Sequence, residues 1–148
     1  MNLILILTLL SGAIADDFEV PPDRFYSTTT VNVEFLGFQE GDCMHPVVRG
    51  SDGQVISLWS FDDMLNYFLS LHVNEEVILD LEEVDSYVMA AEEMVHMLRV
   101  TEAEAGGRTY TAWKDSVLSL GDADAVLGNI TRALHECMYT GSALEGGR

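Results

Sequence analysis

The sequence predicts an α+β fold, with a small mixed or antiparallel sheet packed by two or three helices. Residues 30–35 alternate between apolar and polar side chains, and residues 45–59 have the pattern of a β-hairpin. From about residue 86 onward, apolar side chains recur at helical spacing. Strand patterns therefore come first and helix patterns later, which is the order typical of α+β proteins.

The first strand is expected over residues 30–35, where Val31, Val33 and Phe35 share one face. Before it, residues 16–28 contain two consecutive prolines and indicate a loop or an extended arm. After the turn-rich residues 37–42, two apolar runs, 45–49 and 54–59, flank the sequence Gly-Ser-Asp-Gly. Asp-Gly between apolar runs favours a hairpin.

A helix is expected next, with Ser60 as its N-cap, Asp63 three residues later and Asn74 beyond its end. The short apolar run 77–81 predicts another strand. Strand, helix and strand in this order predict a crossover between parallel neighbours. The helix presents an apolar stripe of Phe61, Met64, Leu65, Phe68 and Leu69.

Residues 86–100 show the clearest helical periodicity. One face collects Tyr87, Ala91, Met94, Val95 and Leu98, and the charged residues lie elsewhere. Gly106 and Gly107 then break the chain, and residues 113–118 indicate a short helix. Asp122 is expected to cap a last helix that reaches about residue 139, with Gly141 at its end. Its inward side chains would be Leu127, Ile130, Leu134, Cys137 and Met138.

The domain organisation follows from the two ends of the chain. Residues 1–15 resemble a secretory signal peptide, because an apolar run is followed by Ala13-Ile14-Ala15, although no Lys or Arg precedes the run. The alternative is a buried N-terminal strand. The run is too short to span a bilayer, which takes about 20 apolar residues. Residues 16–141 are expected to form a single α+β domain, and residues 142–148 a flexible tail.

The compartment decides how the two cysteines are interpreted. Cleavage of a signal peptide would place the protein outside the cell or in the cell envelope, where Cys43 and Cys137 could form a disulfide. Closing so long a loop stabilises a fold by about 4 kcal/mol in the chain-entropy model. In the alternative, cytoplasmic location, the two residues are small buried thiols.

Charge is the most unusual property of the sequence. It has 25 acidic residues against 7 Lys and Arg, a net charge of −18. This balance excludes a protein that tracks nucleic-acid phosphates, which needs a basic surface. No Lys or Arg occurs from residue 50 to residue 98. Three interpretations remain open: a solvated surface, adaptation to high salt, or a surface that binds a basic protein. The candidate partner-binding residues are the densest acids, Glu75, Glu76, Asp80, Glu82, Glu83 and Asp85.

No motif supplies a convincing catalytic or metal centre. The pairs Cys43 with His45 and His135 with Cys137 have the ligand types of zinc but not its usual spacing. Glu93 and His96 match half of a di-iron signature, and no second half exists. We therefore expect no metal, no cofactor and no enzymatic activity.

The sequence thus predicts an exported acidic protein that acts by non-enzymatic protein binding. The alternative is a cytosolic acidic inhibitor, of the antitoxin, immunity-protein or DNA-mimic type. Such an inhibitor would neutralise a basic partner through the acidic face of residues 50–98.

Overall fold

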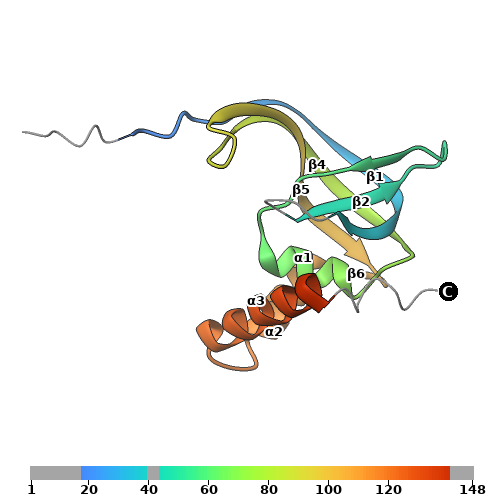
Figure 1. Cartoon of the computed structure of the whole chain (residues 1–148). Helices are drawn as coiled ribbons and strands as arrows, with labels where there is room; N and C mark the ends of the chain where they lie inside the picture. The colour runs from blue at the N-terminus through green and yellow to red at the C-terminus, as the bar shows by residue number, and fades with distance from the viewer. Residues whose placement is uncertain (1–17, 40–43, 141–148) are drawn as a thin grey trace, which may run out of the picture.

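The computed structural model describes residues 18–39 and 44–140, and it shows an antiparallel sheet with helices packed against it (Figure 1). Six strands lie in the order β3-β2-β1-β4-β5-β6. The α+β class is confirmed, and the sheet is larger than the small one expected. The strands are β1 (Arg24–Gln39), β2 (His45–Arg49), β3 (Val55–Ser57), β4 (Glu75–Val88), β5 (Glu93–Ala105) and β6 (Arg108–Thr109); the helices are α1 (Asp63–Ser70), α2 (Tyr110–Leu118) and α3 (Ala123–Thr140).

The sheet curls because β1 is long enough to pair with β2 over one part of its length and with β4 over another. Its second half pairs with β2, and most of its length, from Arg24 to Phe35, pairs with β4. Three hairpin-linked strands followed by a fourth that returns beside the first make a Greek key. Trp59, just after β3, forms a parallel bridge with Arg99 of β5. This bridge brings the two sides of the curled sheet together, so the strands form a partly open barrel.

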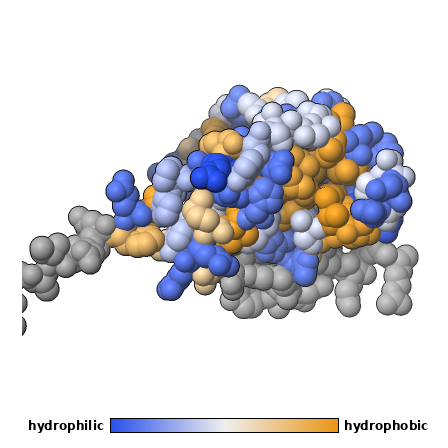
Figure 2. All heavy atoms as spheres, turned by 90° about the horizontal axis from the view of Figure 1, so that it is seen from above, coloured by the Kyte–Doolittle hydropathy of each residue, from blue (hydrophilic) through white to orange (hydrophobic). Residues whose placement is uncertain are grey.

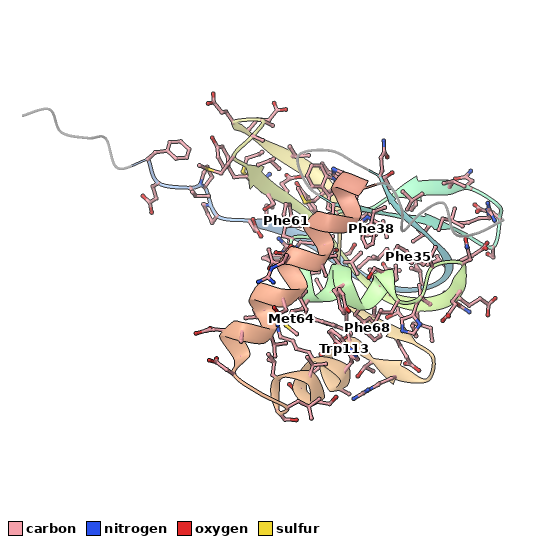
Figure 3. All side chains as sticks on the ribbon, turned by 60° about the horizontal axis from the view of Figure 1, so that its bottom comes forward. Phe35, Phe38, Phe61, Met64, Phe68 and Trp113 are labelled. Atoms are coloured by element: carbon pink, nitrogen blue, oxygen red, sulfur yellow. The ribbon has the colours of Figure 1, made fainter. Side chains whose placement is uncertain are left out.

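The main core lies where the helices cover one end of the curled sheet (Figure 1). Phe35 of β1, Leu79 of β4 and Phe68 of α1 are fully buried there. The ring of Trp113 in α2 lies tilted against that of Phe68 with 5.5 Å between the ring centroids, and Figure 3 shows the two side chains close together below α1. A smaller cluster of Val84, Val88 and Met97 lies under Trp59.

Several predicted elements are confirmed. Residues 30–35 lie within β1, residues 45–49 form β2, and β3 falls inside the predicted run 54–59. Helix α1 buries Met64, Leu65, Phe68 and Leu69 as expected. Its cap was predicted wrongly: Asp62, not Ser60, accepts the N–H groups of Met64 and Leu65. As a result Phe61 lies outside the helix and is half exposed.

The helix predicted over residues 86–100 is wrong, because this region is the hairpin of β4 and β5. The prediction counted apolar residues at helical spacing and overlooked the period-2 burial of Val84, Ser86 and Val88. Residues 89–92 make the turn, with Glu92 in the left-handed region at φ 54°. Leu98, assigned to the inner face of the helix, is 40% exposed.

The predicted parallel crossover is also wrong. β3 and β4 are not neighbours, and every strand pair in the described sheet is antiparallel. The helix between them instead carries the chain across the end of the barrel. Residues 16–28 were predicted to be a loop or an extended arm; from Arg24 onward they are extended and pair with β4 as the start of β1, so the loop alternative is wrong there.

The C-terminal helices agree with the sequence. Gly106 and Gly107 have φ of 58° and 74° and form the turn before β6. Asp122 accepts the N–H of Asp124, and α3 buries Ile130 and Leu134. Leu127, predicted to point inward, is 39% exposed. The predictions for residues 1–15, for Cys43 and for residues 142–148 lie outside the described residues, as do the side chains of residues 135–140.

Candidate binding groove

A groove opens at the end of the barrel that the helices do not cover. It has a volume of about 310 Å³. Inward-facing side chains of β1, β2 and β4 form its floor, because successive residues of a strand point to opposite faces. Ile56 of β3 and Leu98 of β5 flank it, and both are about 40% exposed, at 41% and 40%. Its apolar residues are Val31, Val33, Val48, Ile56, Leu81 and Leu98.

The rim of this groove is polar, and its charged residues are acidic. Asp52 and Glu83 lie among its lining residues, together with Ser27, Thr29 and Gln54, whereas no Lys or Arg within residues 18–39 and 44–140 lines it. Asp52 is held in place because its carboxylate accepts the backbone N–H of Gln54 at 2.9 Å. Figure 2 looks onto the molecule from above, where hydrophobic side chains gather over the β1–β2 half of the sheet and hydrophilic ones border them.

Glu83 connects the groove to an acidic cluster around His96. The two ring nitrogens of His96 lie 2.7 Å from Asp85 Oδ1 and 3.1 Å from Glu83 Oε1. Ser27 donates its hydroxyl to Glu83 at 2.9 Å, and Tyr26 donates its own to Asp85 at 2.5 Å. The strand register produces this cluster, since Asp85 lies directly opposite His96 on β5.

These contacts shift two pKa values in opposite directions. The hydrogen bond with Asp85, and then that with Glu83, raises the pKa of His96 above 6.5. The hydrogen bond from Tyr26, followed by that from His96, lowers the pKa of Asp85 below 3.8. The cluster is solvent-exposed, so it adjusts the charge of the rim and contributes little to stability.

The six acids predicted to bind a partner all lie on β4, but the strand divides them between two faces. Glu83 and Asp85 point to the groove side, and Glu75 pairs with His72 at 2.7 Å. Glu76, Asp80 and Glu82 alternate with the buried Val77, Leu79 and Leu81, so they point to the outer face. The structure therefore does not gather them into one surface.

On the outer face of the sheet, some carboxylates lie opposite other carboxylates, and others form ion pairs with arginine. Glu76 lies directly opposite Glu34 of β1, and Arg49 pairs with Glu34 at 2.9 Å. Arg99 bridges Glu82 and Asp23 at 2.9 and 3.0 Å. Partial burial of Arg99 disfavours its charged form, but the hydrogen bonds to Glu82 and Asp23 outweigh this and raise the pKa of Arg99. The hydroxyl of Ser86 and then Arg99 lower the pKa of Asp23.

Sequence reasoning missed most of the groove. Its floor residues looked like ordinary core, and Leu98 and His96 were assigned to a helix. The alternating burial of β4 and the turn at residues 89–92 were the patterns that could have placed His96 opposite Asp85. Glu93 and His96, which match half of a di-iron signature, form no joint site, since Glu93 is exposed and His96 binds β4 carboxylates.

The groove combines an apolar floor with carboxylates at its rim. Within residues 18–39 and 44–140, no group of three His, Cys, Asp or Glu side chains is placed to hold a metal ion. None of the helices that the structure describes is both long and apolar enough to cross a membrane.

The chain matches no protein-family model, no curated protein and no solved structure.

Proposed function

We propose that this protein acts by non-enzymatic binding of a basic protein partner, and that the groove is its binding site. One observation carries the proposal: an apolar floor, formed by Val31, Val33 and Leu81, is bordered by Asp52 and Glu83, and the lining contributed by the described part of the chain contains no Lys or Arg. Concave apolar sites with a few placed polar groups are the usual form of a binding site.

The groove defines the chemistry of the partner. Its floor offers apolar surface, whose burial contributes roughly 25 cal/mol per Å². Its rim and the net charge of −18 favour Arg and Lys on the bound segment. The expected ligand is a chain segment with apolar side chains for the floor and basic ones for Glu83 and Asp52.

Two cellular settings fit such a protein. In the first, which we favour, the protein is exported and residues 1–15 are removed. In the second, it is a cytosolic inhibitor that blocks a basic protein with the outer acids Glu76, Asp80 and Glu82. The N-terminal sequence of the native product separates them, because an exported protein would begin near Asp16.

The proposal is tested with a displayed library of random 12-residue peptides, selected against the full chain at low salt. Selected peptides should be enriched in Arg and Lys combined with apolar residues. Their affinity should fall by about tenfold or more between 50 and 500 mM NaCl, because salt screens exposed charges. Selected peptides with no excess of basic residues would contradict the proposal.

A further inference from the structure

The edge of β5 carries backbone groups that the sheet does not use. Trp59 donates its N–H to the carbonyl of Leu98 at 2.9 Å and accepts the N–H of Val100 at 2.8 Å. In a strand, alternate residues direct both backbone groups to the same side. Leu98 and, by the same alternation, His96 and Met94 therefore face away from β4. No backbone hydrogen bond from a described residue reaches the N–H or C=O of His96 or Met94 on that side.

The facing edge of β3 has the same property. The N–H of Leu58 bonds the carbonyl of Pro46, so alternate residues of β3 pair with β2. Val55 and Ser57 must then direct their backbone groups away from β2, toward the side on which Trp59 meets β5. The two strands run parallel at the Trp59–Arg99 bridge. A seam with unused donors and acceptors therefore begins at Trp59 and opens toward the tip of the β4–β5 hairpin.

This seam lies along the groove. Ile56 lies between the edge residues Val55 and Ser57, Leu98 lies at the closed end of the β5 edge, and both line the groove. The hairpin that carries the β5 edge stands clear of the helices (Figure 1). Residues 93–98 contain neither Lys nor Pro, the residues that commonly protect an exposed edge strand.

We infer that the partner segment binds as an added β-strand along the free edge of β5, with its alternate side chains in the groove. This inference rests on the proposed function and specifies how the partner is held. Main-chain hydrogen bonds to His96 and Met94 supply affinity for any extended segment, and pockets for alternate side chains supply selectivity.

Charge identifies the occupant as a segment of a basic protein. Every second side chain of the added strand faces the same side as His96, Asp85 and Glu83, which together carry more negative than positive charge. Arg or Lys at those positions meets carboxylates, while apolar residues reach Leu98 and Ile56. The expected pattern is therefore a run in which basic and apolar residues occupy one face of an extended strand.

The test uses a library-selected 12-residue peptide in which single backbone amides are N-methylated one at a time. N-methylation removes a donor, so methylation of amides that face β5 should weaken binding by about fivefold or more each. Methylation of the intervening amides should leave the affinity within about twofold. In the protein, bound peptide should slow hydrogen exchange at the amides of Met94 and His96.

A second arm removes a donor on the protein itself. Met94→Pro loses an edge-facing N–H without removing a bond to β4, and Met94→Ala retains that N–H. Only the proline variant should lose peptide affinity, and its circular dichroism should be unchanged.

Binding that shows no alternation on methylation would overturn the added strand and leave the proposed function standing. Failure of every basic peptide to bind would overturn both. A dimer that Met94→Pro dissociates would show that a second copy, and not a basic partner, occupies the edge.

Discussion

Trp59 and Arg99 form the parallel bridge that joins the chain after β3 to strand β5. Two backbone hydrogen bonds of 2.9 and 2.8 Å make this bridge, and the Trp59 side chain covers the cluster of Val84, Val88 and Met97. The bridge closes one end of the seam and leaves the other open. The groove exists because the sheet is closed at this one point and no further.

Trp59→Ala should lower the free energy of unfolding by about 2 kcal/mol, because a half-buried aromatic side chain leaves the apolar cluster uncovered. Its backbone bonds remain, so the fold should be retained. Phe61→Ala is the control, since Phe61 contacts Trp59 but is half exposed and should cost less than about 1 kcal/mol. Urea unfolding measures both. Equal losses would contradict the role given to Trp59.

Asp62→Ala should cost about 2 kcal/mol, because one carboxylate both caps α1 and accepts the Tyr110 hydroxyl at 2.6 Å. Burial, together with Asp62, raises the pKa of Tyr110, so this phenol stays protonated.

Ser60→Ala is the control and should change the free energy of unfolding by less than about 0.5 kcal/mol, since the buried Ser60 hydroxyl has no partner among the described residues. Thermal unfolding of the two variants compares them, and a larger loss for Ser60→Ala would restore the cap predicted from sequence.

Glu76→Thr should raise the unfolding free energy by a few tenths of a kcal/mol, roughly the cost of like charges on directly opposite strand positions. Thr also suits a strand. The gain should shrink in 1 M NaCl, where the Debye length is about 3 Å. A loss of stability at low salt would show that Glu76 is not repelled by Glu34.

The pKa of His96, measured by NMR titration, should lie above 6.5 and should fall toward that value in Asp85→Asn. Because the folded-state pKa is raised, the stabilisation from His96 is fully present below pH 6.5 and is lost as pH rises through the folded pKa. Glu93→Gln is the control, since the His96 ring bonds Asp85 and Glu83, and no hydrogen bond or ion pair joins it to Glu93 among the described residues. An unchanged His96 pKa in Asp85→Asn would contradict the cluster.

The sequence predicted those elements in which the local pattern of apolar and polar residues matches the faces that the fold buries and exposes. The alternation at Val31, Val33 and Phe35 and the Asp-Gly turn at residues 52–53 lead directly to β1 and the β2–β3 hairpin. The apolar pattern of residues 113–118 similarly leads to α2, and Asp122 with the apolar residues after it leads to α3. In each case, side chains close in sequence are enough to specify the element.

The β4–β5 hairpin could not be predicted in this way. The run from Tyr87 to Leu98 contains enough apolar residues to fit a helical stripe, and only the pairing of β4 with β5 shows that some of them face solvent. The groove depends on the same long-range register. Glu83, His96 and Leu98 come together because β4 and β5 pair at a particular offset, which composition and spacing do not reveal.

The claim that a basic segment binds in this groove is tested most directly by peptide binding to Leu98→Arg and Leu120→Arg. Both replace an exposed leucine by the same cation, but Leu98 lines the groove and Leu120 follows α2, 85% exposed. Calorimetric titration with a library-selected basic peptide should show a loss of at least about tenfold in affinity for Leu98→Arg and less than about twofold for Leu120→Arg. Equal affinities for the two variants would contradict the groove as the binding site.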